Sequence, residues 1–211
     1  PLELLPRTRR EIIVRLKREG PLSAGDLSER LEVSASAARQ LLSALEGDGL
    51  VTHRRERRGP GRPVHLYELT ERGDALFPRR YADLATELLG YLAEIDDGLL
   101  AEIFRRRRER RVAEARLRLD GLGFEGRVRE LARILDEDGY LTEVRSTGSG
   151  FLIVEHNCAV HRVAERYGQA CSSEIEFIRE VLPGAQVRRV THIASGGPAC
   201  TYEIEPPESS I

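Results

Sequence analysis

The chain has 211 residues, a net charge of −2 and 40% hydrophobic residues, enough for one large domain or two small ones with an apolar core. No segment approaches the roughly 18 consecutive apolar residues of a membrane helix, and the first residues, PLELLPRTRR, lack the apolar stretch of a signal peptide. We therefore expect a cytoplasmic protein with no membrane partner, in a reducing compartment where cysteines act as ligands or catalysts more often than they form disulfides.

Three helical patterns occupy the first 49 residues. The first ends at Gly20, the second begins at the potential N-cap Ser23, and the third begins at Ser34. The third pattern directs Leu42 and Leu45 to one face before two glycines break it. The order is therefore helix, short helix, turn and longer helix.

A basic hairpin follows these helices. Two strand-like runs, 50–53 and 64–69, flank a loop that contains glycine and proline. Its arginines are Arg54, Arg55, Arg57, Arg58 and Arg62. The order is typical of a winged helix-turn-helix domain, which we place at residues 1–78, with double-stranded operator DNA as its partner. The outward positions of the third helix, which we expect at base edges, are Ser36, Arg39, Gln40 and Ser43. The alternative is a small helical module with a solvated arginine loop.

Residues 79–120 return to helical periodicity. Leu84, Leu88, Tyr91 and Ile95 recur at helical spacing and require a partner surface. Twofold dimers are common among winged-helix proteins, so we expect a homodimer through this helical connector. The run RRRRERR at 105–111 has glutamates nearby, and we interpret it as a solvent-exposed helix with i, i+4 ion pairs.

Residues 121–211 alternate between helical and strand patterns. The order is one helix, a hairpin around 147–150, two helices and a second hairpin around 195–198. The predicted fold class is α+β: an N-terminal winged helix-turn-helix, a helical dimerisation connector and a C-terminal α+β domain that binds a cluster.

The three cysteines fall at the ends of predicted elements. Cys158 lies where a strand gives way to a helix, Cys171 at the start of the next helix, and Cys200 at the start of the last strand. Ligands cluster where chain ends converge, so this placement favours a metal or cluster site. Two alternatives remain: cysteines that act as small apolar residues, and a nucleophilic pair of Cys158 with His161.

Four stretches carry a family resemblance. GPGRPVHLYELTERGDALFPRRYADLA, EHNC at 155–158, CSSEIEFIREVLPG from Cys171, and RVTHIASGGPACTYEI resemble the Suf repressor family. These winged-helix regulators sense iron–sulfur clusters and control the operon for cluster assembly. The resemblance extends over nearly the whole chain. It implies a dimeric repressor that binds its operator when the cluster is loaded and that is not an enzyme and has no small-molecule substrate.

The family pattern is C-x12-C-x13-C-x14-C. Cys158, Cys171 and Cys200 match three of its positions, and Ala185 stands where the family has its third cysteine. The resemblance therefore implies a [4Fe–4S] cluster with a non-cysteine fourth ligand, which could be a histidine, a carboxylate or an external group. Among the histidines we favour His192, then His156.

Other cofactors and functions stay open. A [2Fe–2S] cluster or zinc could occupy the cysteines, and the protein could be a zinc- or thiol-based redox-responsive repressor. A hypothesis from another class is a thiol enzyme with an accessory winged-helix module that contacts proteins.

Overall fold

The computed structural model describes residues 2–57 and 63–207. The chain divides into two compact units, Pro1–Arg79 and Arg80–Ile211. Residues 80–120 of the expected connector therefore belong to the second unit. None of the helices in the described ranges is long and apolar enough to cross a membrane.

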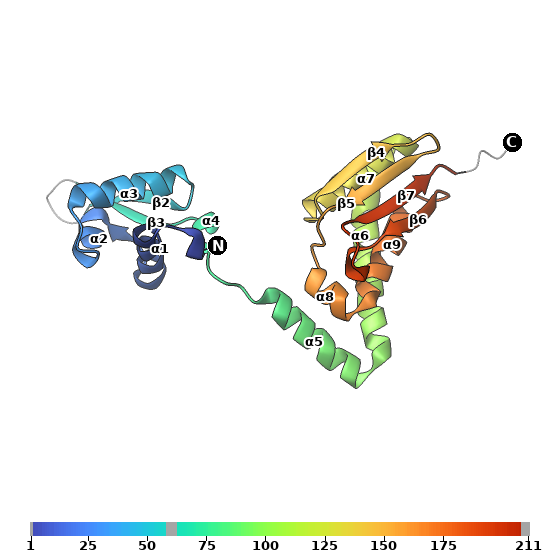
Figure 1. The fold of residues 1–211 in the computed structure, drawn as a ribbon, viewed down its shortest axis with the longest axis horizontal. Coiled ribbons are helices and arrows are strands. Elements are labelled where there is room, and N and C mark those ends of the chain that lie inside the picture. The colour runs from blue at the N-terminus through green and yellow to red at the C-terminus, as the bar shows by residue number, and fades with distance from the viewer. Residues whose placement is uncertain (1, 58–62, 208–211) are drawn as a thin grey trace. The chain divides into compact units, whose positions relative to one another are not determined.

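The first unit contains three main helices and a small antiparallel sheet with strand order β1-β3-β2 (Figure 1). The elements are η1 (Leu2–Leu4), α1 (Arg7–Glu19), β1 (Leu22–Ser23), α2 (Ala24–Arg30), α3 (Ala35–Gly47), β2 (Val51–Glu56), β3 (Val64–Leu69) and α4 (Glu71–Asp74).

Local chemistry sets the helix ends of this unit. Gly20 adopts a φ of 83° after α1, a conformation that favours glycine. Ser23 and Asp26 form a capping box at the start of α2, and the Ser34 hydroxyl accepts a hydrogen bond from the Ala37 amide in α3. The predicted caps and the predicted winged helix-turn-helix order are confirmed. The sequence did not indicate β1, because two residues are too short for a periodic pattern.

The second unit combines helices with a four-stranded antiparallel sheet of order β4-β5-β7-β6. Its elements are α5 (Tyr81–Ile95), α6 (Asp97–Leu119), α7 (Phe124–Glu137), β4 (Thr142–Ser146), β5 (Phe151–Glu155), α8 (His161–Arg166), α9 (Gly168–Val181), β6 (Gln186–Thr191), η2 (Ile193–Ser195) and β7 (Cys200–Glu205). Helices α6, α7 and α9 lie together against one face of the sheet (Figure 1). The predicted α+β class is confirmed.

Buried and more exposed side chains alternate along β7, and the buried ones contribute to the core of this unit. Cys200, Tyr202 and Ile204 in β7 are buried while the residues between them are less so. They pack in one cluster with Leu131 of α7 and Phe177 of α9, both fully buried. The inward face of β7 therefore carries a cysteine at its first position.

The arginine run in α6 differs from its expected solvated state. Arg106 pairs with Glu102 at 2.6 Å, and Arg110 pairs with Glu114 at 2.9 Å, in the predicted i, i+4 spacing. Arg111 instead has a side chain only 12% exposed and turns toward α9. The interpretation of the whole run as an exposed helix face is wrong at this position, because an ion pair across 63 residues neutralises the buried guanidinium.

Candidate functional site

The structure brings the three cysteines together around one pocket of the second unit. Cys158 lies in the loop between β5 and α8, Cys171 in the first turn of α9, and Cys200 begins β7. They line a small pocket with a volume of about 20 Å³. The other lining residues are Tyr140, Glu155, Val160, Ala164, Ala170, Glu174, His192 and Tyr202.

Burial dominates the chemistry of the three thiols. Desolvation raises the pKa of Cys158, Cys171 and Cys200 above the ordinary value for cysteine. Backbone N–H groups oppose this effect at two of them: the Ile193 amide donates to Cys200 Sγ at 3.4 Å, and the Val160 backbone lowers the pKa of Cys158. Such N–H to sulfur contacts stabilise thiolates and tune iron–sulfur clusters.

The two candidate histidines have different locations. His192 lines the pocket, and its Nδ1 lies 2.9 Å from Ser195 Oγ. His156 is exposed, and its Nε2 lies 3.3 Å from a carboxylate oxygen of Glu143 on β4. The structure therefore brings His192 to the cysteines and does not bring His156 there.

Ala185 also lies away from the cysteines. It directly precedes β6, whereas His192 directly follows that strand. At about 3.3 Å per residue, a strand carries the chain about 23 Å over these seven residues. Ala185 packs against the main core and does not line the pocket. A side chain at position 185 therefore does not reach this pocket. A fourth ligand from the protein has to come from the residues that line it.

Sequence reasoning missed two buried carboxylates beside the cysteines. Glu155 is 2% exposed and Glu174 is 5% exposed. Oε1 of Glu155 has no hydrogen-bond partner within the described part of the chain. Burial, and then the neighbouring Glu174, raise the pKa of Glu155 to about 9, while Arg111 and Arg189 offset only part of this rise. The signal in the sequence was the place of Glu155 two residues after Ile153 in the strand FLIVE, on the inward face.

Glu174 differs from Glu155 because its charge is neutralised. Its Oε2 accepts hydrogen bonds from Arg111 at 2.9 Å and from the Tyr140 hydroxyl at 3.0 Å. The Arg111 guanidinium also lies 4.1 Å from the ring centroid of Phe177. This network fixes one wall of the pocket.

The donor set of the pocket has the chemistry of an iron–sulfur site. Three thiols and backbone N–H donors to sulfur are the groups that hold such clusters. Within the described ranges, no three His, Cys, Asp or Glu side chains are grouped as a single metal ion requires, with sulfurs about 2.3 Å from one point in the case of zinc. In a cluster each thiolate binds a different iron, so the donors stand further apart.

The expected nucleic-acid contacts lie on the surface of the first unit. Ser36, Arg39, Gln40 and Ser43 are all exposed on α3. Arg54, Arg55 and Arg57 are exposed along or just after β2. Arg58 and Arg62 lie outside the described residues.

Helix α5 has an apolar face that the rest of its unit leaves exposed. We call this set the α5 seam: Tyr81, Leu84, Leu88, Tyr91 and Ile95, with exposed fractions of 52–73%. Their spacing of three, four, three and four residues is the a/d repeat of a coiled coil. No residue of α5 is buried, so the helix lacks the apolar partner that such a pattern requires.

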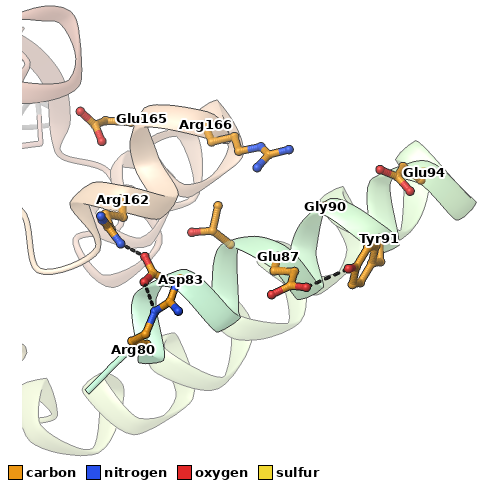
Figure 2. Close-up of a pocket in the computed structure, with 10 residues that line it drawn as sticks. Arg80, Asp83, Glu87, Gly90, Tyr91, Glu94, Arg162, Glu165 and Arg166 are labelled. Atoms are coloured by element: carbon orange, nitrogen blue, oxygen red, sulfur yellow. Dashed lines mark hydrogen bonds and ion pairs between the residues drawn. The ribbon is translucent and has the colours of Figure 1, made fainter. Parts of the chain in front are cut away.

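Helix α8 directly follows the loop that carries Cys158, and it packs against α5. Figure 2 shows the surface where the two helices meet, with Arg162 of α8 paired to Asp83 of α5. The hydroxyl of Tyr167 donates to the Thr86 carbonyl of α5 at 3.1 Å. A Cβ added at Gly90 would lie 3.2 Å from that hydroxyl, so the close approach depends on glycine.

The same contact region reaches the cysteines. Cys158 and Cys171 pack against an apolar cluster that includes Tyr167, Leu89 and Phe104. Side chains from α5, α6 and α8 therefore contact one another directly beside two of the three thiols.

Residues 6–53 match the family described as "Bacterial regulatory protein, arsR family". No curated protein matches the sequence. Similar solved structures include NMB1585, a MarR family regulator from Neisseria meningitidis (19% identity, 64% of this chain and 79% of that chain, TM-score 0.31). PadR from Bacillus subtilis, in complex with operator DNA, is another (16% identity, 61% and 89%, TM-score 0.30). Both likenesses are remote.

The family match and the fold of the first unit identify this unit as a winged helix-turn-helix of the type found in bacterial transcriptional regulators.

Proposed function

We propose that this winged-helix regulator senses iron–sulfur clusters and represses a Suf operon for cluster assembly, binding its operator as a dimer when the cluster is loaded. The observation that carries the proposal is the convergence of Cys158, Cys171 and Cys200 on one pocket. A regulator needs a ligand with different affinities for two conformations, and this pocket joins two helices and a strand.

The state of the thiols favours a cluster over the alternative sensors. A thiol-based sensor needs a low pKa, because the thiolate is the reactive form. Burial raises the pKa of all three cysteines, which disfavours a sensor that relies on free thiolates. Three thiols with backbone N–H donors to sulfur suit an iron–sulfur cluster, and we propose a [4Fe–4S] cluster as the cofactor.

DNA binding follows from the exposed face of α3 and the basic β2 strand. Arg39 and Gln40 carry donors that suit the base edges of guanine and adenine. Arg57, beside the loop between β2 and β3, suits contact with phosphates. We propose an inverted-repeat operator as the partner, since a twofold dimer presents two such faces.

The α5 seam is the proposed dimer contact, with α5 of a second copy as its occupant. Its a/d spacing matches the self-complementary packing of two identical helices. Apolar side chains exposed by half or more along one continuous face are costly to leave in water, at roughly 25 cal/mol per Å². Pairing two seams removes that exposure from both copies.

Coupling between pocket and dimer runs through α8. When bound, the cluster supplies an oxidation-sensitive link among the three cysteines. Cys158 precedes α8 and Cys171 follows it, so holding both fixes the position of this helix. Tyr167 and Arg162 carry that position to α5 through their contacts with Thr86 and Asp83. We expect release of the cysteines to change the geometry of the seam, and with it the spacing of the two DNA-binding faces.

Gly90→Val tests the coupling. Its side chain would push Tyr167 away from α5, because even a Cβ lies 3.2 Å from the hydroxyl. We expect unchanged iron content with a reduced difference in operator affinity between loaded and metal-free protein. A full difference in affinity would contradict the route through α8.

Iron and acid-labile sulfide analysis of anaerobically purified protein tests the cofactor. The expected result is about four of each per chain with visible absorption of a cluster. Cys200→Ser should lose stable iron, whereas Ser172→Ala, an exposed neighbour of Cys171, should not. A colourless wild type without sulfide, or unchanged iron in Cys200→Ser, would refute the assignment.

A further inference from the structure

We infer that Glu155 supplies the fourth protein ligand of the cluster, an inference that rests on the proposed function. Besides the three cysteines, the pocket is lined by three other kinds of donor: His192, the carboxylates and the hydroxyls of Tyr140 and Tyr202. The choice among them follows from burial, position on the sheet and the partners that each donor already has.

The sheet fixes Glu155 beside a ligand. Glu155 and Cys200 are directly paired residues of the antiparallel strands β5 and β7. Directly opposed residues share a face, with Cβ atoms about 4.5–5.5 Å apart. Cys158 follows Glu155 by only three residues, so one short segment places both beside Cys200.

Glu155 has one carboxylate oxygen without a partner among the residues that the structure describes, although its side chain also interacts with the Tyr202 hydroxyl. It is 2% exposed, and its Oε1 is buried without a hydrogen-bond partner in the described residues. A buried carboxylate is costly unless a proton or a metal ion neutralises it. Glu174, by contrast, already accepts bonds from Arg111 and Tyr140. Iron accepts carboxylate oxygen as a ligand, so binding to an iron satisfies the orphaned oxygen.

His192 is the weaker candidate for structural reasons. It follows the end of β6 and begins a one-turn 3-10 segment, η2. Its Nδ1 lies 2.9 Å from Ser195 Oγ, which leaves Nε2 available to a metal, but the side chain is only partly buried. A ligand on a paired strand is held more precisely than one at the end of a strand.

The test compares wild type with Glu155→Gln, Glu155→Cys and His192→Ala, all reconstituted anaerobically with the Mössbauer isotope of iron. In the wild type, one iron of the four should differ from the three bound by thiolates. Glu155→Gln should change or lose that iron, Glu155→Cys should give four thiolate-bound irons with full iron content, and His192→Ala should match the wild type. Thermal unfolding of each metal-free variant checks that the fold persists.

The outcomes separate this inference from the function on which it rests. A wild type that binds no iron and sulfide overturns both. A wild type that loads normally, with Glu155→Gln indistinguishable from it or with the distinct iron lost in His192→Ala, overturns only the role of Glu155. Loss of the cluster in both Glu155→Gln and Glu155→Cys would make Glu155 a structural residue and equally overturn its role as a ligand.

Discussion

Replacing Arg111 with methionine should destabilise the second unit by about 3–5 kcal/mol, because the change leaves a buried carboxylate without its partner. The Arg111 and Glu174 side chains are 12% and 6% exposed, and the two lie 2.9 Å apart. With a urea m-value of about 2 kcal/mol/M, the transition midpoint of this unit should fall by about 2 M. Far-UV circular dichroism of the metal-free protein in increasing urea measures this midpoint. The unfolding of the first unit, which the substitution does not touch, serves as the internal reference.

The adjacent arginine provides a matched control. Arg110 is 83% exposed and pairs with Glu114, which is 63% exposed. Arg110→Met should therefore cost no more than about 0.5 kcal/mol. Adding Glu174→Leu to Arg111→Met should recover much of the loss, because it removes the uncompensated charge. A cost of under about 1 kcal/mol for Arg111→Met would refute the reasoning about this buried network.

Three further results are expected. Combining Leu84→Glu with Leu88→Glu should give a monomer in sedimentation, whereas Leu117→Glu on α6, also exposed, should stay dimeric; a dimeric double variant would exclude the α5 seam. The folded-state pKa of Glu155, about 9, lies above its unfolded value, so the free energy of unfolding of metal-free protein should fall as pH rises from about 5 to 9, by up to about 1.4 kcal/mol per unit. Glu155→Gln should remove this pH dependence of the free energy of unfolding. A wild-type free energy that does not change with pH would contradict the raised pKa of Glu155. In operator titrations, Arg57→Ala should weaken binding across sequences and lower the salt slope by about 1, whereas Arg39→Ala should change which bases are preferred; the same profile for both would contradict their separate roles.

The elements of the first unit could be predicted because their signals are local. The Ser23 capping box and the Gly20 stop act within four residues of the chain. The order of helices and strands in the second unit was predictable for the same reason. The ends of strands β5 and β7 also indicated correctly where Cys158 and Cys200 would lie.

The partners of the cysteines could not be predicted, because they depend on pairings between distant residues. Glu155 joins the pocket through its register with Cys200, 45 positions later. Arg111 appeared to belong to a solvated run until its contact with Glu174 placed it inside. Ala185, which stands at the family's third cysteine position, precedes β6, whereas the pocket residue His192 follows that strand.

The most direct test of the central claim is the operator affinity of one preparation before and after removal of its cluster. Fluorescence anisotropy with a promoter fragment of the organism's own cluster-assembly operon gives both values at the same salt concentration. The cluster-loaded protein should bind more tightly by about 5- to 150-fold, the usual range of coupling between two sites. Equal affinity of the loaded and cluster-free forms would contradict the proposal that the three-cysteine pocket controls DNA binding.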